Sequence, residues 1–198
     1  FSDDRHWLPL VVAEYLEVTG DESVLDEVTA FIEAPPLPLE QEDAYVQPTI
    51  SETAATVYEH CLRAIEAGRA VGAHGLPLIG GGDWNDGMNR IGHGGSGESV
   101  WMAWFLGHVL LRFAPICERR GDVRLAEDYR AWAASLAEAA ETNGWDGPWY
   151  RRAYFDDGTP LGTKDAEECR IDAIAQAWAT ISGLADPVRA ECALAAVD

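Results

Sequence analysis

Residues 98–118 read ESVWMAWFLGHVLLRFAPICE, a stretch that is apolar on nearly every side when it is drawn as a helix. A helix of this kind is buried on most sides, whereas a surface helix keeps a polar face. The stretch therefore predicts a central helix. The large side chains that carry this pattern are Trp101, Trp104, Phe105, Leu106, Val109, Leu110 and Phe113.

Helical patterns recur on both sides of this stretch. Asp3 and Asp4 precede apolar positions that run from Trp7 to Leu16, and Gly20 ends the pattern. Similar patterns predict helices over residues 53–71, 123–141, 171–182 and 187–197. Buried and amphipathic helices in sequence, with functional loops between them, predict an all-α fold in which outer helices wrap inner ones.

Two segments interrupt the helical patterns. Residues 34–50 are rich in Pro and carboxylates and are expected to form a surface excursion. Residues 149–155 alternate in the manner of a strand and precede the turn signal Asp157-Gly158. We therefore expect a short β-hairpin inserted within residues 143–166.

The composition limits the classes of partner. The 198 residues are 47% hydrophobic, which is enough to build a core, and their formal net charge is −20. Nucleic acids and anionic membranes are bound by clustered Lys and Arg, so the charge argues against both. A neutral substrate such as a glucan is compatible with it.

The four cysteines and the apolar runs bear on the cellular setting. Cys61, Cys117, Cys169 and Cys192 are far apart and show no C-x-x-C spacing, so neither a metal site nor a disulfide framework is expected. A reducing, cytoplasmic setting is therefore the simpler expectation. No apolar run approaches the roughly 20 residues that span a bilayer, so we expect no direct membrane insertion by this segment.

The loop of residues 81–89, GGDWNDGMN, is the main candidate for a functional site. Carboxyl groups such as Asp83 and Asp86 supply general acid and base chemistry, and the Trp84 indole offers an apolar face to a sugar ring. The Asn85 amide both donates to and accepts from hydroxyl groups. These residue types together indicate a carbohydrate-active enzyme.

The i, i+3 spacing of Asp83 and Asp86 places both carboxylates on one side of a helical turn. Two like charges so close together do not both ionise easily, so one would keep the proton that a general acid needs. The alternative is a turn or helix cap, since Asp, Asn and Gly are also common turn formers. A calcium loop is excluded, because Gly87 and Met88 stand where a ligand and then Gly are required.

Three further features allow both a functional and a structural interpretation. The Gly-rich residues 92–98 could hold a phosphate at a helix N-terminus, or form a loop capped by Glu98 in the first helical turn. One of Arg151 and Arg152 is expected to meet a carboxylate. Asp172 and Gln176 share a helix face that could line a pocket or join a buried network.

Four collinear motifs together resemble glycoside hydrolase family 94. They are SDD-x-x-WLP at residues 2–9, LPLIGGGDWNDGMN at 76–89, GESVW at 97–101 and YRRAYFDDG at 150–158. That family holds the inverting cellobiose and chitobiose phosphorylases and the C-terminal module of bacterial cyclic β-1,2-glucan synthases, to which this version of the motif looks closest. The resemblance covers nearly all of the chain.

The resemblance implies an (α/α)6 barrel and phosphorolysis of a β-glucoside with inversion. It assigns the general acid to Asp86, places Trp84 against the sugar, and leaves Asp83 and Asn85 as further substrate-binding candidates. The implied substrates are a β-glucan oligosaccharide, with β-1,2 linkages expected, and inorganic phosphate, with neither cofactor nor metal. Asp83 would either help to raise the pKa of Asp86 or hold the loop by hydrogen bonds.

The resemblance also implies that residues 1–198 are one partial catalytic barrel, since the family's phosphate-binding residues and its upstream sugar-binding segment find no match here. Uncovered apolar helix faces would then favour a homo-oligomer. The longer protein would be cytoplasmic, attached to the bacterial inner membrane in the manner of a synthase. Two other functions stay open, a non-catalytic carbohydrate-binding fragment and an inverting (α/α)6 hydrolase, which needs a second carboxylate about 6.5–9.5 Å from the acid.

Overall fold

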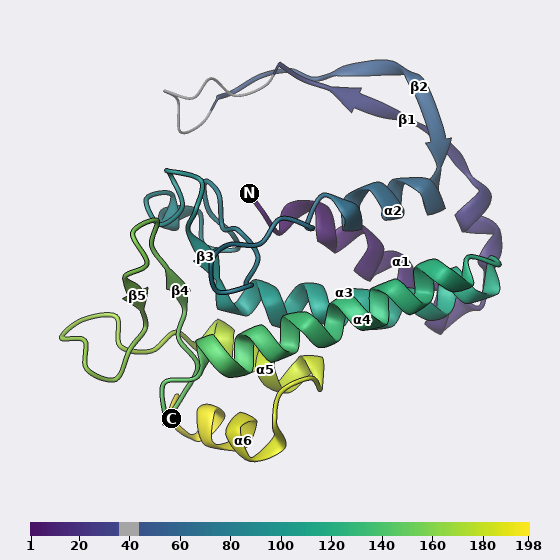
Figure 1. Cartoon of the computed structure of the whole chain (residues 1–198). Helices are drawn as coiled ribbons and strands as arrows, with labels where there is room; N and C mark the ends of the chain where they lie inside the picture. Colours follow the sequence, from purple (N-terminus) through teal and green to yellow (C-terminus); the bar gives the residue numbers. More distant parts are fainter. Residues whose placement is uncertain (36–43) are drawn as a thin grey trace.

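The computed structural model describes residues 1–35 and 44–198, and its centre is the helix α3, Val100–Arg119. This helix packs against α4 (Val123–Ala139), α5 (Ala173–Ser182) and α1 (Trp7–Thr19), as Figure 1 shows. The side chains of Trp101, Trp104 and Phe105 are fully buried. The prediction of a central helix is therefore confirmed, and its cause is the burial of apolar surface on nearly every side.

The start of α3 differs from the prediction. Ser99 caps the helix, and its hydroxyl accepts a hydrogen bond from the amide of Met102 at 3.4 Å. Glu98 lies outside the helix, in strand β3 (Glu98–Ser99), so the expected cap by Glu98 in the first helical turn is wrong. A hydroxyl at the N-cap satisfies an amide that the helix itself leaves unpaired.

The predicted helix over residues 53–71 is shorter in the structure. It runs as α2 from Val57 to Glu66 and begins with a reciprocal capping box between Thr56 and Glu59. The residues before it form strand β2, Thr49–Thr56, which pairs antiparallel with β1, Val28–Glu33. The capping box requires extended backbone at Thr56, which explains why the helical pattern cannot continue toward residue 53.

Strands β1 and β2 form a ribbon that lies above α2 in Figure 1, and the ring of Phe31 in β1 stacks on His60 of α2. Residues 36–43 of the expected surface excursion lie outside the described residues, and residues 49–50 belong to β2. Val28, Ile32 and Ile50 on this ribbon are exposed.

A second small sheet joins the start of α3 to the predicted hairpin. Strands β4 (Ala153–Tyr154) and β5 (Pro160–Leu161) form that hairpin around Gly158, whose φ of 82° suits glycine, and β3 pairs with β4. The hairpin is thus confirmed, but the all-α class is corrected to a mostly helical fold with two small sheets. Helix α6, Pro187–Ala195, completes the chain beside α5.

The sequence led us to expect no apolar run of membrane-spanning length, but helix α3 is long enough to be compared with one. Among the described residues it is the one helix long and apolar enough to cross a membrane, judged by length and composition. In the structure 78% of its most apolar window is buried against the rest of the chain, as in a core helix.

His6, just before α1, makes stability depend on pH. The side chain is 1% exposed, and its Nδ1 has no hydrogen-bond partner among the described residues. Burial, followed by the charge of Arg5, lowers the pKa of His6 from 6.5 to about 4. As the pH falls, His6 is therefore protonated in the unfolded chain before it is protonated in the folded chain. The free energy of unfolding decreases as a result between about pH 6.5 and pH 4.

We expect His6→Leu to remove about 2 kcal/mol of the stability difference between pH 7 and pH 5. Urea unfolding of the 198-residue chain at both pH values measures this effect. His93→Leu, which removes an exposed imidazole, is the control. Equal pH dependence in the wild-type chain and in His6→Leu would refute the assignment.

Candidate active site

The loop of residues 80–89 leaves the small sheet close to the start of α3. The amide of Ile79 donates to the carbonyl of Gly97 at 2.9 Å, and the amide of Gly82 donates back to Ile79 at 3.1 Å. Gly82 has a φ of 133°, and a Cβ there would lie 3.0 Å from the Phe1 ring. A glycine is therefore required at this position, both for the backbone conformation and for the close approach.

The chain N-terminus closes this loop from the other side. The amide of Ser2 donates to the carbonyl of Gly82 at 2.9 Å, which brings the first residues of the chain to the loop. Sequence reasoning recognised the SDD-x-x-WLP motif but assigned no site residue to it. Two residues that lie 80 positions apart in the sequence leave no local pattern of their contact. The only indication that Ser2 and Gly82 lie close together was that both belong to motifs of the same family.

Asp83 points into the protein interior and is fully buried. Its Oδ2 accepts hydrogen bonds from Ser99 Oγ at 2.7 Å, from Trp101 Nε1 at 2.7 Å and from an Nη of Arg152 at 2.8 Å. A second Arg152 nitrogen donates to Asp83 Oδ1. The loop is thus anchored to α3 and to the residue before β4 by one buried, fully paired carboxylate.

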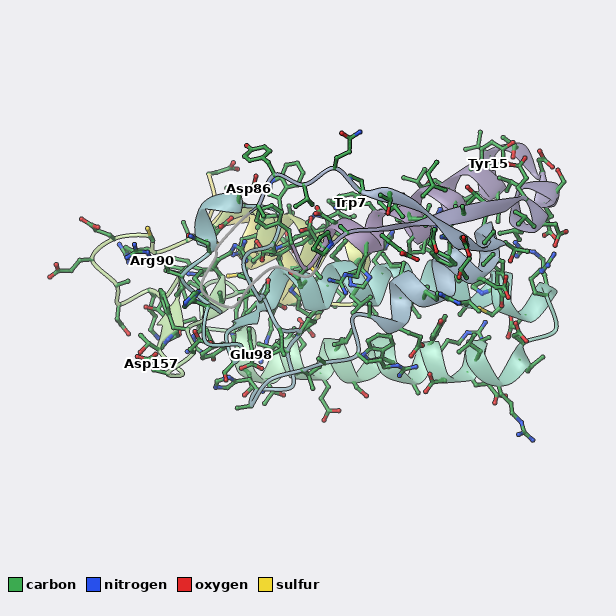
Figure 2. All side chains as sticks on the ribbon, turned by 90° about the horizontal axis from the view of Figure 1, so that it is seen from above. Trp7, Tyr15, Asp86, Arg90, Glu98 and Asp157 are labelled. Carbon is green, nitrogen blue, oxygen red and sulfur yellow. The ribbon has the colours of Figure 1, made fainter. Side chains whose placement is uncertain are left out.

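Asp86 has the opposite placement. It is exposed, as are Asn85 and Trp84, whose side chain is 63% accessible. Asp86 begins a 3-10 turn, Asp86–Met88, which is capped by the Asn85 side chain accepting from the amide of Gly87 at 3.0 Å. Figure 2 shows Asp86 and Trp7 toward the same edge of the molecule, opposite Glu98.

The predicted sharing of one helical turn by Asp83 and Asp86 is therefore wrong. The short turn begins at Asp86, and Asp83 lies before it with its charge matched by Arg152. The alternative interpretation, a turn or helix cap, describes Asn85, whose side chain caps the short turn. The same loop exposes Asp86 and Trp84. The roles of Asp83 and Asn85 in sugar binding stay predictions, because no ligand contact tests them.

Two open hollows meet at Trp84 and Asp86. One, of about 410 Å³, is lined also by Asn85, Gly87, Arg152, Asp172 and Ile174. The other, of about 570 Å³, is lined also by Asp3, Asp4, Trp7 and Asp83. The exposed carboxyl and indole therefore lie between two spaces that can each receive part of a ligand.

The Gly-rich loop before α3 is held by a protein carboxylate. Asp156 accepts from the amides of Gly94 at 2.6 Å, Ser96 at 2.8 Å and Gly97 at 2.9 Å. Partial burial raises the pKa of Asp156, but these amide donors outweigh it and hold the pKa below its usual range. Because Asp156 occupies the amides, the structure favours the loop interpretation of residues 92–98 over a phosphate site.

Glu98 performs a similar anchoring role on the neighbouring turn. It is 2% exposed and accepts from the amides of His74 at 3.0 Å and Leu76 at 3.1 Å, and His74 Nδ1 lies 2.5 Å from its Oε2. The turn that precedes the candidate loop is thereby fixed to β3.

The two arginines both meet carboxylates, where the sequence predicted that one would. Arg151 pairs with Asp146 at 2.5 Å, and Arg152 Nε donates to Asp172 Oδ2 at 2.9 Å besides its contacts to Asp83. Gln176 exchanges hydrogen bonds with the backbone of Tyr150, at 2.9 and 2.8 Å, so the network interpretation is confirmed there. Asp172 belongs to the same network through Arg152, caps α5 by accepting from the amide of Ile174 at 3.0 Å, and also lines a hollow.

The fold and the site define a class of protein segment: mostly helical, with a carboxyl and an indole exposed on one anchored loop. The chain belongs to the glycosyl hydrolase 94 superfamily, whose catalytic-domain model matches residues 1–198. The family resemblance drawn from the motifs is therefore confirmed.

The chain is similar to three characterised members. It is 48% identical over 197 residues to cyclic beta-(1,2)-glucan synthase NdvB of Rhizobium meliloti, covering 99% of this chain and 7% of that protein. It is 38% identical over 200 residues to solabiose phosphorylase of Paenibacillus borealis, covering 100% of this chain and 24% of that protein.

It is also 37% identical over 199 residues to 3-O-beta-D-glucopyranosyl-beta-D-glucuronide phosphorylase of the same organism, covering 100% of this chain and 24% of that protein. The chain thus spans a quarter or less of the length of these relatives.

Proposed function

We propose that the chain is the acid-bearing segment of an inverting glycoside phosphorylase that acts on β-glucans, with β-1,2 linkages the best candidate. Family membership and relatives that are named as phosphorylases support the reaction class. The similarity to a cyclic beta-(1,2)-glucan synthase supports the linkage. The observation that carries the proposal is the exposed Asp86 carboxyl between two hollows beside an exposed indole.

In this mechanism Asp86 donates its proton to the glycosidic oxygen as the bond from that oxygen to the anomeric carbon breaks. The bonding electron pair leaves with the oxygen, which becomes the hydroxyl of the shortened glucan. An oxygen of hydrogen phosphate forms the new bond from the opposite face, which inverts the β-glucoside to α-glucose 1-phosphate. The proton released by the phosphate restores Asp86, so the step balances without a cofactor.

The surrounding residues have supporting roles in this proposal. Trp84 packs against a pyranose face, and Asn85 contributes an amide to the hydroxyls of the sugar. Asp83 fixes the loop through Arg152, the second of the two roles that the family resemblance allows. Phosphate is already a competent nucleophile, so a single acid suffices, whereas an inverting hydrolase needs a further carboxylate to activate water.

The relatives' lengths support a further part of the proposal, that residues 1–198 are one segment of a longer (α/α)6 barrel. The mostly helical architecture around α3 is compatible with it. Apolar side chains on the outer side of α1, Val11 and Val18 in particular, are 61% and 83% exposed. We propose that other parts of the barrel, or a second copy of the protein, cover them.

Incubation of the full-length protein with β-1,2-gluco-oligosaccharides tests the reaction class. We expect glucose 1-phosphate to appear only when inorganic phosphate is present. Free glucose released in phosphate-free buffer would instead support the hydrolase. Binding without turnover under either condition would support a non-catalytic carbohydrate-binding role.

A further inference from the structure

Asp3 is a buried carboxylate at the edge of the candidate site. Its side chain is 2% exposed, yet it lines the hollow that also contains Trp7, Trp84 and Asp86. It comes from the chain N-terminus, which the bond from the Ser2 amide to Gly82 ties to the candidate loop. Asp3 and the proposed acid therefore line the same hollow, although they come from segments far apart in the sequence.

The two carboxylate oxygens of Asp3 have different surroundings. Oδ2 accepts a hydrogen bond from Trp7 Nε1 at 3.0 Å. Oδ1 is buried and has no hydrogen-bond partner among the described residues. A buried carboxylate oxygen without a donor is costly, and such exceptions call for an explanation such as an absent ligand.

The environment suits a neutral donor rather than an anion. Burial raises the pKa of Asp3, and the hydrogen bond from Trp7 offsets part of that effect. The same hollow contains Asp4, Asp83 and Asp86, so a phosphate ion would meet several carboxylates there. A sugar hydroxyl carries no charge and donates a hydrogen bond, so it can pair with the Asp3 carboxylate without adding a like charge.

The indoles of Trp7 and Trp84 give this hollow apolar walls. Their ring centroids lie 6.3 Å apart with an interplanar angle of 56°. Trp7 is itself packed against Phe105, with ring centroids 4.6 Å apart, and against Trp178 at 6.2 Å. An indole fixed in this way offers the C–H face of a pyranose a surface that needs no reordering.

We propose that Asp3 is a substrate-binding residue, whose Oδ1 accepts a hydrogen bond from a hydroxyl of a sugar unit that packs in this hollow against the wall formed by Trp7 and Trp84. The hollow on the Arg152 and Asp172 side of Asp86 then receives the other part of the substrate, which puts the scissile oxygen beside the acid. This inference rests on the proposed function and assigns one sugar position of that site.

The test compares the full-length protein and its variants in phosphorolysis of a β-1,2-gluco-oligosaccharide. We expect Asp3→Asn to raise the KM for the oligosaccharide at least about tenfold, because the variant replaces a charge-assisted acceptor with an amide. Asp157→Asn, an exposed carboxylate on the β4–β5 turn, is the matched control and should leave KM unchanged. An unchanged KM in Asp3→Asn would overturn the proposal.

A second measurement separates sugar binding from a purely structural role for Asp3. In the reverse reaction, analogues of the acceptor sugar and of glucose 1-phosphate that each lack one hydroxyl are compared in the wild-type protein and in Asp3→Asn. One missing hydroxyl should weaken the wild-type reaction about tenfold and have little further effect in the variant, since the partner is already lost. If every deoxy sugar is affected equally in both proteins, Asp3 does not bind the sugar.

The outcomes also distinguish this inference from the proposed function. If Asp86→Asn retains full phosphorolysis, the proposed acid is wrong, whatever the result at Asp3. If Asp86→Asn is inactive and Asp3→Asn has wild-type KM with no deoxy-sugar difference, only the assignment of Asp3 fails.

Discussion

Replacement of Arg152 by Met is expected to destabilise the chain by about 3–5 kcal/mol, the usual cost of leaving a buried charge without its partner. The side chains of Arg152 and Asp83 are 1% and 0% exposed, so water cannot replace the missing guanidinium. Asp172 loses its charged partner as well. Urea unfolding of the 198-residue chain, followed by tryptophan fluorescence, measures the change.

The matched control is Arg119→Met, which removes an arginine from an exposed ion pair. Arg119 and Glu22 lie 2.5 Å apart, but both side chains are 47% exposed, so we expect a loss of no more than about 1 kcal/mol. A double variant, Arg152→Met with Asp83→Asn, should recover part of the loss because no unpaired charge then remains buried. Equal stabilities for Arg152→Met and Arg119→Met would contradict the role given to the buried pair.

If the proposed function holds, replacement of Asp86 by Asn reduces kcat for phosphorolysis of a β-1,2-gluco-oligosaccharide by about 10²–10⁴-fold, the usual contribution of general acid catalysis. Asparagine has nearly the same shape but cannot transfer the proton. Because Asp86 is exposed, the variant should unfold at the same urea concentration as the wild-type chain. Loss of activity together with a comparable loss of stability would instead indicate a structural role for Asp86.

Together the predictions assign different roles to Asp83 and Asp86, two carboxylates that lie three residues apart in the sequence. Asp83→Asn should mainly lower stability, since its partners Ser99, Trp101 and Arg152 are all protein groups. Asp86→Asn should mainly lower activity. Spacing alone treats the two residues as a pair, whereas the fold turns one inward and leaves the other at the surface.

Local signals predicted much of the fold. The central helix follows from apolar residues on every side of residues 98–118, and the β4–β5 hairpin follows from alternation before Asp157-Gly158. The β1–β2 ribbon was missed because its pairing, Val28 with Thr56, joins residues that lie 28 positions apart in the sequence. Helix and strand propensities near residue 53 gave no warning of that partner.

The candidate site was predicted less completely than the fold. The loop composition singled out Trp84 and Asp86, and the family resemblance distinguished Asp86 from Asp83. The pairing of Asp83 with Arg152 spans 69 residues, and the approach of the N-terminus to Gly82 spans 80. Such contacts depend on how helices and sheets pack, and a single sequence carries no local pattern for them.

The most direct test of the central claim is a leaving-group comparison in the full-length protein with inorganic phosphate present. A β-1,2-gluco-oligosaccharide needs a proton on its departing oxygen, whereas 2,4-dinitrophenyl β-glucoside departs as a stable phenolate and needs none. If Asp86 is the general acid, Asp86→Asn loses activity on the oligosaccharide but keeps wild-type release of glucose 1-phosphate from the aryl glucoside. Equal loss on both substrates, or full activity on the oligosaccharide, would contradict the account.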